Sequence, residues 1–258
     1  MSDIGRRGFL GIVPAAAFIP TGQSAVAPVA LDGFPHQEAA TVKEMVGVAH
    51  GNVAKVKELV SARPALARAA WDWGYGDWES ALGAAAHVGH KEIAQILLDN
   101  GAHPTVFSAA MLGQIDVVRG FIASTPGIQR TRGPHGITLL AHARAGGTAD
   151  MVKYLESLGD ADPRYPNVPL SEEDRAGLLG VYVFGSGPTE RLIVSRNTRG
   201  DLVMKRDGEV DRNLFHHGHR AFNPAGAEAV RIQFEPATGK AASVEVLDGP
   251  VRVRARST

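Results

Sequence analysis

The sequence predicts a chain with two folded parts, a helical solenoid followed by a small antiparallel β-domain. Between residues 38 and 163, apolar residues recur three and four positions apart, which is the period of a buried helix face. Three prolines then fall between residues 163 and 169, which suits a stiff linker over residues 164–170. After residue 171 the apolar period changes to two, the spacing expected for strands.

The composition argues against several classes of function. The 258-residue chain carries 27 basic and 27 acidic residues without a block of like charge, which argues against binding to nucleic acid or to an anionic membrane. It contains no cysteine, so disulfides, thiolate nucleophiles and cysteine-ligated zinc are excluded. Hydrophobic residues make up 44% of the chain, which is enough for one or two domains with cores of their own.

Residues 1–30 are expected to be an export signal and a disordered N-terminus. The stretch Gly5-Arg6-Arg7-Gly8-Phe9-Leu10 resembles the twin-arginine export signal of bacteria. The apolar run over residues 9–19 is shorter than the roughly 20 residues that span a bilayer, and Ala25-Val26-Ala27 is similar to a signal cleavage site. The resemblance implies a periplasmic protein whose mature form is not stably inserted in a membrane. The alternative is a disordered N-terminus with a chance pair of arginines.

Four amphipathic segments in the first part of the chain resemble one another. A glycine precedes each segment, and glycine closes a preceding helix well because it tolerates the left-handed backbone conformation. The segments are residues 53–60, 91–98, 115–122 and 149–155, and the glycines are Gly51, Gly89, Gly113 and Gly147. This pattern predicts four repeats, each of which ends in one of these helices.

The repeated unit resembles the ankyrin repeat, which has about 33 residues and consists of a turn and two antiparallel helices. The resemblance is carried by residues 80–90 and 136–140 and by the repeat endings at residues 100–104 and 158–163. It implies four degenerate ankyrin repeats over residues 35–163. It also implies a binding protein, and we expect a protein partner whose identity the repeats do not indicate.

All three tryptophans lie in the stretch WDWGYGDW, residues 71–78. Gly51 and Gly89 stand 38 residues apart, whereas Gly89 and Gly113 stand 24 residues apart. Against a period of about 33 residues, the tryptophans therefore occupy a lengthened connection next to a shortened one. In the ankyrin family this connection projects as a finger beside the concave face.

The aromatic finger is the predicted binding surface, because tryptophan and tyrosine dominate binding hot spots. The alternative is that the indoles cover the apolar flank left bare by the shortened connection, and a catalytic role is least favoured. Residues ahead of the repeat glycines add a second, concave patch, although methionine at helical spacing is more often a core residue. The predicted partner-binding residues are Trp71, Trp73, Tyr75, Trp78, His87 and Met111.

Residues 171–258 are predicted to form a small antiparallel β half-barrel or sandwich. Seven segments with strand patterns are separated by turn formers such as Arg206-Asp207-Gly208. The segments are residues 180–184, 190–194, 201–205, 213–216, 230–234, 243–246 and 251–254. With Leu179-Gly180-Val181-Tyr182 at its start, this layout resembles the lipocalin-like accessory domain of penicillin-binding-type serine hydrolases. That resemblance implies no catalytic residues, and small-molecule or lipid binding by this domain is the alternative function.

The histidines at positions 216, 217 and 219 are the strongest metal-binding candidate in the sequence. On a strand His217 and His219 would face the same side, and Asp207, Glu209 or Asp211 could supply a third ligand. A polar strand end is the favoured interpretation, so neither a metal nor another cofactor is predicted. A metal-assisted hydrolase centred on these histidines is the least favoured function.

Signatures of other enzymes are missing. The sequence contains no phosphate-binding loop, no G-x-S-x-G elbow and no H-E-x-x-H motif. A carboxylate pair could be built from Asp72, Asp77 and Glu79, but nothing in the sequence indicates a buried carboxyl group there. We therefore expect an exported, non-enzymatic recognition protein with no catalytic residues.

Overall fold

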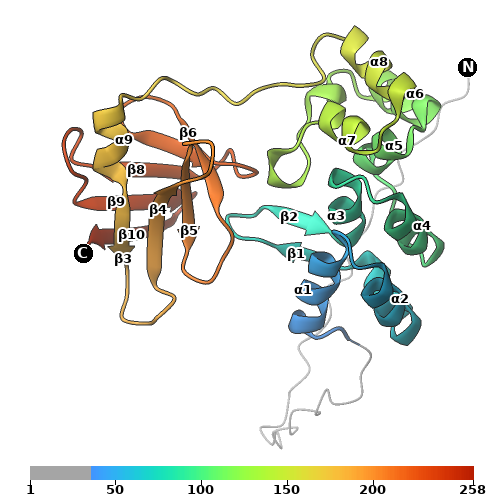
Figure 1. Cartoon of the computed structure of the whole chain (residues 1–258), viewed down its shortest axis with the longest axis horizontal. Helices are drawn as coiled ribbons and strands as arrows, with labels where there is room; N and C mark the ends of the chain where they lie inside the picture. The colour runs from blue at the N-terminus through green and yellow to red at the C-terminus, as the bar shows by residue number, and fades with distance from the viewer. Residues whose placement is uncertain (1–35) are drawn as a thin grey trace, which may run out of the picture. The chain divides into compact units, whose positions relative to one another are not determined.

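The computed structural model describes residues 36–258, which hold helices first and strands afterwards (Figure 1). The predicted export signal at residues 1–30 lies outside the described residues. Within residues 36–258, no helix combines the length and the apolar character that crossing a bilayer requires.

Eight helices of the first part form four successive pairs. The pairs are α1 (Ala39–Val48) with α2 (Val53–Ala62), α3 (Ala81–His87) with α4 (Lys91–Asp99), α5 (Val106–Leu112) with α6 (Ile115–Ser124), and α7 (Leu139–Ala145) with α8 (Ala149–Ser157). The first helices of the pairs pack in the order α1, α3, α5, α7. This is the stacked arrangement that the four repeated segments predict.

Local sequence explains where the first helices begin and why they stack closely. Ser80, Thr105 and Thr138 each cap a helix by accepting a backbone N–H with the side-chain oxygen, which satisfies a donor that the helix leaves unpaired. Alanines fill the contacts between neighbouring first helices, and Ala85 and Ala110 are completely buried. Gly146 fits against the Met111 carbonyl so closely that a methyl group would collide with it.

The finger, residues 70–80, is a hairpin of two short strands. Strand β1 (Ala70–Asp72) pairs antiparallel with β2 (Trp78–Ser80), and Trp71 lies opposite Glu79. At its tip Gly74, Tyr75 and Gly76 have φ angles of 101°, 62° and 75°. Only glycine adopts such angles readily, so the tip is a tight turn with one strained residue, Tyr75.

The second part is a closed antiparallel barrel of eight strands. Its strands are β3 (Gly180–Val183), β4 (Arg191–Arg196), β5 (Leu202–Arg206), β6 (Arg212–His216), β7 (Ala221–Pro224), β8 (Arg231–Glu235), β9 (Ser243–Asp248) and β10 (Val251–Ser257). Helix α9 (Glu172–Leu178) precedes the first strand. Three short 3-10 turns, Pro64–Arg68, Ile128–Arg130 and Pro134–Gly136, complete the described elements and belong to the helical part.

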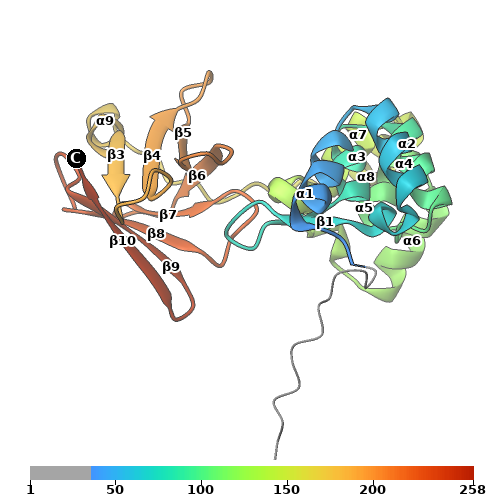
Figure 2. The same ribbon diagram turned by 90° about the horizontal axis from the view of Figure 1, so that it is seen from below.

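The predicted half-barrel or sandwich is wrong, because the sheet closes on itself. Strand β10 pairs with β9 on one side and with β3 on the other, and Figure 2 shows β10 beside β3. The sequence pattern also did not indicate β7. Tyr182, Phe222 and Phe234 are fully buried inside, so the middle of the barrel is filled by side chains.

Candidate metal centre

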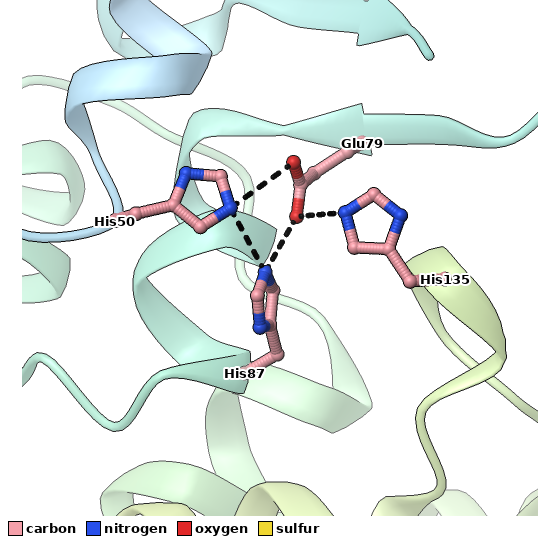
Figure 3. A group of neighbouring side chains, drawn as sticks. All are labelled: His50, Glu79, His87 and His135. Carbon is pink, nitrogen blue, oxygen red and sulfur yellow. Dashed lines mark hydrogen bonds and ion pairs between the residues drawn. The ribbon is translucent and has the colours of Figure 1, made fainter. Parts of the chain in front are cut away.

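Four side chains from separate segments of the helical part converge on one point (Figure 3). His50 lies in the turn after α1, Glu79 in strand β2, His87 at the end of α3, and His135 in the 3-10 turn that leads into α7. Each residue offers one ligand atom, and these atoms all lie within 4.8 Å of one another. The group therefore consists of three imidazoles and one carboxylate.

Three of the separations between these atoms are close to the edge length of a zinc tetrahedron. His87 Nε2 lies 3.1 Å from His50 Nε2 and 2.9 Å from Glu79 Oε1, and His135 Nε2 lies 3.3 Å from the same Oε1. With zinc–nitrogen bonds of about 2.0–2.1 Å, the ligand atoms of a tetrahedron are separated by about 3.3 Å. The three observed separations lie at or below that value.

Hydrogen bonds outside the centre orient two of the rings. His50 Nδ1 lies 3.1 Å from the Val46 carbonyl oxygen and 3.0 Å from that of Gly47. Carbonyl oxygens only accept, so the proton belongs on Nδ1, and Nε2 keeps its lone pair. His135 Nδ1 likewise lies 2.7 Å from Asp77 Oδ2. Metal-bound histidines are oriented in this way, by an acceptor for the other ring nitrogen.

Glu79 is oriented by the finger itself. Its side chain is completely buried, and Trp73 Nε1 donates a hydrogen bond of 2.7 Å to Oε2. The other oxygen, Oε1, is buried and has no hydrogen-bond donor of good geometry, although it faces the ring nitrogens of His87 and His135. A buried carboxylate oxygen needs a partner, which the imidazoles supply only while they carry protons, and a metal cation in the centre would replace those protons.

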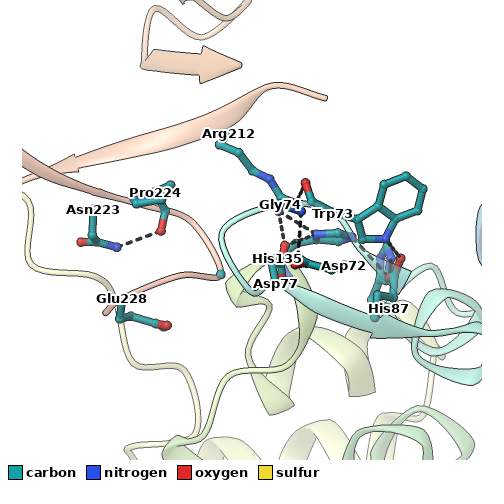
Figure 4. A network of polar contacts seen from close by, with 12 residues as sticks. Asp72, Trp73, Gly74, Asp77, His87, His135, Arg212, Asn223, Pro224 and Glu228 are labelled. Carbon is teal, nitrogen blue, oxygen red and sulfur yellow. Dashed lines mark hydrogen bonds and ion pairs between the residues drawn. The ribbon is translucent and has the colours of Figure 1, made fainter. Parts of the chain in front are cut away.

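Asp77 extends the site to the barrel (Figure 4). Its side chain accepts from the backbone N–H of His135 at 2.8 Å and forms an ion pair with Arg212 of strand β6. Arg212 also donates to the carbonyl oxygen of Trp73 at 3.0 Å. His135 has a φ of 60°, which is unfavourable for a residue other than glycine, so Asp77 holds it in a strained backbone conformation.

Two buried carboxylates dominate the electrostatics of the site. Burial raises the pKa of Glu79, but contacts with His135 and His87 outweigh it and lower the pKa to about 2. Burial likewise raises the pKa of Asp77, while bonds from His135 and the charge of Arg212 bring it below the ordinary value. Burial lowers the pKa of His135, yet the bond to Asp77 and the contact with Glu79 raise it to about 9. The centre therefore favours positive charge.

The four side chains of the centre differ in exposure. The side chains of His50, His87 and His135 are 32%, 11% and 25% exposed, whereas that of Glu79 is 0% exposed. The carboxylate is thus the most deeply buried of the four groups, and the imidazoles lie closer to solvent.

The structure divides the predicted partner-binding residues among different environments. Trp71 and Trp73 are half-buried against the core of the first two helix pairs, with Lys43 Nζ 5.5 Å and 6.0 Å from their ring centroids. Tyr75 packs against the barrel core, and Trp78 is 63% exposed. The predicted contribution of Met111 to a binding surface is wrong, because this side chain is completely buried in the helical core.

The structure places His87 in the candidate metal centre, together with three residues that were not predicted as ligands. Two finger carboxyl groups are buried although nothing in the sequence indicates it, since Asp77 and Glu79 are 3% and 0% exposed. His50 and His87 do carry a signal, because they stand one and two residues before a repeat glycine and so lie near the same point of the repeat. His135 carries no such signal.

The histidines at 216–219 do not form the alternative metal site. His217 Nε2 lies 2.6 Å from Asn223 Oδ1, and His216 is buried with Nδ1 3.0 Å from the Val168 carbonyl oxygen. Strand β6 ends at His216, so the side-by-side arrangement expected for His217 and His219 is lost in the following turn. Within residues 36–258, the single convergent group of three or more metal-ligating side chains is the one around Glu79.

Comparisons with known proteins support one of the four predicted ankyrin repeats. An ankyrin-repeat family model matches residues 77–109, which include β2, α3 and α4 and therefore Glu79 and His87. Ankyrin repeats commonly mediate protein–protein binding. No curated protein matches the chain. The lipocalin-like and export-signal resemblances remain predictions.

Two solved structures show local similarity at low TM-score. A crystal structure of SurE with D-Leu is 23% identical over 45% of this chain and 28% of that chain, with a TM-score of 0.25. A second crystal structure of SurE is 24% identical over 44% of this chain and 27% of that chain, with a TM-score of 0.24. The similar region covers less than a third of either SurE chain, and similarity this low supports no conclusion about fold or function.

Proposed function

We propose that this protein binds a divalent transition metal, with zinc preferred, through His50, Glu79, His87 and His135. The observation that carries the proposal is the convergence of four ligand atoms within 4.8 Å, three pairs of which are 2.9, 3.1 and 3.3 Å apart. Imidazole and carboxylate are common zinc ligands, and zinc accepts four-coordinate geometry without electronic preference.

The four protein ligands support a structural rather than a catalytic metal. Catalytic zinc sites have three protein ligands and leave the fourth position for water, whereas structural sites are complete. A complete shell here would join the turn after α1, the finger, α3 and the turn before α7. It would therefore hold the finger against the repeats, in keeping with the proposal that the protein is not an enzyme.

The first test is a metal titration of the chelator-treated full chain. We expect one equivalent of Zn²⁺ to bind by calorimetry and elemental analysis, and Co²⁺ to give the intense visible bands of tetrahedral coordination. His87→Ala and Glu79→Gln should abolish the tetrahedral spectrum, while His103→Ala, at an exposed histidine outside the centre, should preserve it. Binding that persists in both ligand variants would refute the assignment.

Protein recognition at the finger is the second proposal, and it rests on the exposure of Trp78. This indole is 63% exposed in a strand whose next residue, Glu79, belongs to the metal centre. The ankyrin match supports a protein partner, and the Arg6-Arg7 pair followed by an apolar run supports export of the chain. The metal would then hold the finger in the conformation that the partner recognises.

Site-specific photo-crosslinking in the cells that produce the protein tests this second proposal. A photoreactive amino acid at position 78 should give a discrete protein adduct, whereas one at Val251 should not. Val251 is a matched control because it is 60% exposed and lies in the barrel. Equal adducts at both positions, or none at position 78, would count against recognition by the finger.

A further inference from the structure

A cavity of about 410 Å³ lies where the tip of the finger meets one end of the barrel. The finger contributes Trp73 and Tyr75, and the barrel contributes an apolar wall that includes Phe184, Leu192 and Val246. Cavities that hold small molecules have volumes of about 300–1,000 Å³ and mostly apolar walls with a few placed polar groups. The size and the lining therefore suit a small ligand.

The finger tip is constructed so that Tyr75 reaches this cavity. Asp72 Oδ1 accepts the backbone N–H of Gly74 at 2.8 Å, and the Asp77 N–H donates to the Gly74 carbonyl oxygen at 3.2 Å. These bonds hold Tyr75 at a φ of 62°, an angle that a non-glycine residue keeps only when its surroundings impose it. Strain of this kind concentrates at functional sites.

Two polar side chains in the wall have a hydrogen-bond donor without a partner. Arg212 is 4% exposed, and its Nε is buried without a partner, although both terminal nitrogens are engaged. The Tyr75 hydroxyl makes no hydrogen bond within the described part of the chain, and burial raises the pKa of Tyr75 to about 12, so the hydroxyl stays protonated.

Arg206 supplies a cation at the rim of the same cavity. Its Nε donates to the Thr189 carbonyl oxygen at 2.9 Å, and its guanidinium lies 5.7 Å from the centroid of Phe184. Among residues 36–258 it forms no ion pair with a carboxylate, which leaves its charge available. The two acids of the lining, Asp72 and Glu209, are respectively bound into the finger turn and exposed at the rim.

We propose that this cavity binds a small amphipathic monocarboxylate. Its apolar body would lie against Phe184, Leu192 and Val246, and its carboxylate would accept hydrogen bonds from Arg206, the Tyr75 hydroxyl and Arg212 Nε. The cavity is separate from the metal centre. Among the residues that support the metal centre, only Trp73 and Arg212 also line the cavity. Its occupancy can therefore be tested whether or not the metal binds.

The test compares two probes that differ only in the head group. Octanoate and octanol are titrated into the full chain, with calorimetry for affinity and tryptophan emission as the local reporter, since Trp73 lines the cavity. We expect one octanoate to bind saturably and octanol to bind at least about tenfold more weakly, as one charged hydrogen bond is worth about 1.5–3 kcal/mol. Absence of saturable octanoate binding, or equal affinity for the two probes, would overturn the proposal.

Variants then assign the binding to this cavity. Arg206→Gln should weaken octanoate binding about tenfold and leave octanol unaffected. Tyr75→Phe should weaken octanoate binding less, and Arg199→Gln, in a turn outside this cavity, should not change it. An unchanged octanoate affinity in Arg206→Gln would place the carboxylate elsewhere and overturn the assignment. Because Arg206 is exposed and Tyr75→Phe removes only a hydroxyl, both variants should fold, and circular dichroism checks this.

Val246→Trp supplies an independent measurement, because a larger side chain would fill the cavity from strand β9. Val246 is only partly buried, so the strand has room for the change. We expect this variant to lose both probes while its zinc stoichiometry stays that of the parent chain. Retained octanoate binding in a folded Val246→Trp chain would contradict the proposed location. If the variant does not fold, the head-group comparison and Arg206→Gln decide the question.

Discussion

The Nε2 atoms of His50 and His87 lie 3.1 Å apart, although the residues are separated by 37 positions in the chain. Backbone carbonyls accept from His50 Nδ1, so its Nε2 directs a lone pair at the other ring. Two neutral imidazoles can face each other in this way only if His87 Nε2 carries a proton or a cation lies near both. A hydrogen bond accounts for the contact in the metal-free chain, and a bound cation would replace that proton.

Zinc should stabilise the folded chain through this geometry. A ligand that binds only the folded state adds about 2.7 kcal/mol to the free energy of unfolding when its free concentration is roughly 100 times the dissociation constant. We expect urea unfolding of the parent chain to shift accordingly with zinc. Glu79→Gln should show no zinc-dependent shift, and a shift of parental size in that variant would contradict the role of the carboxylate.

The metal-free chain should lose stability in mild alkali. The pKa of His135 is raised from 6.5 to about 9, because its bonds to Asp77 and Glu79 outweigh the opposing effect of burial. A raised pKa stabilises the folded state fully below pH 6.5, and this contribution disappears as the pH rises through about 9. Urea unfolding measured from pH 6 to pH 10 should show the loss, roughly across the window of that titration.

Two controls identify the group that titrates. His135→Asn should flatten the dependence over that window, whereas His103→Ala, at an exposed histidine, should retain it. Saturating zinc should also remove it, since the metal takes the place of the proton on His135. If the free energy of unfolding still falls with pH in His135→Asn, the titration belongs to another residue.

Asp77 should contribute to metal affinity without touching the metal. It accepts from both the ring and the backbone N–H of His135, and outer partners of this kind are worth about 10–100-fold in metal affinity. Asp77→Asn should therefore weaken zinc binding by about that factor in competition with a chelating dye. Asp116→Asn, at an acid whose side chain is 96% exposed, is the control and should leave the affinity unchanged.

Close stacking of the repeats predicts a steric effect at Gly146. A methyl group there would collide with the Met111 carbonyl, whereas a methyl group at Gly51 would meet nothing within 4 Å. Gly146→Ala should lower the free energy of unfolding by about 1–3 kcal/mol, as overpacking usually does. Gly51→Ala should be close to neutral by the same denaturant titration, and equal losses would indicate a backbone rather than a packing effect.

Tryptophan fluorescence should separate the three indoles of the finger. Trp78 is 63% exposed, while Trp71 and Trp73 pack against the helical core. Iodide should quench the parent chain in part, and Trp78→Phe should leave blue-shifted emission that iodide hardly affects. Strong quenching in that variant would mean that the other two indoles are exposed in solution.

The helical part could be predicted because its signals are local. Ser80 and Thr138 cap helices, and glycines at fixed places end them, so each pair can be recognised within one repeat. Closure of the barrel could not be predicted in the same way. It depends on the pairing of β10 with β3, in which Arg256 lies opposite Val183. The sequence patterns of these two strands are those of any strand and do not indicate which strands pair.

The convergence of the four candidate ligands was missed for a related reason. Its ligands span residues 50 to 135 and meet only after the repeats have stacked. Buried Glu79 is flanked in the sequence by an exposed tryptophan and a helix cap, so its burial has no periodic signature. The weaker histidine cluster at 216–219 was conspicuous only because its members are adjacent in the sequence.

The four ligands bridge the first, second and fourth helix pairs and bypass the third. In a solenoid each repeat normally contacts only its neighbours, so repeats at the ends can unravel independently of the rest. An ion bound by ligands from residue 50 to residue 135 would add a long-range link between repeats that otherwise contact only their neighbours. Without the ion, hydrogen exchange should reveal an end repeat that opens before the middle. With it, the repeats should open together, as a single cooperative unit.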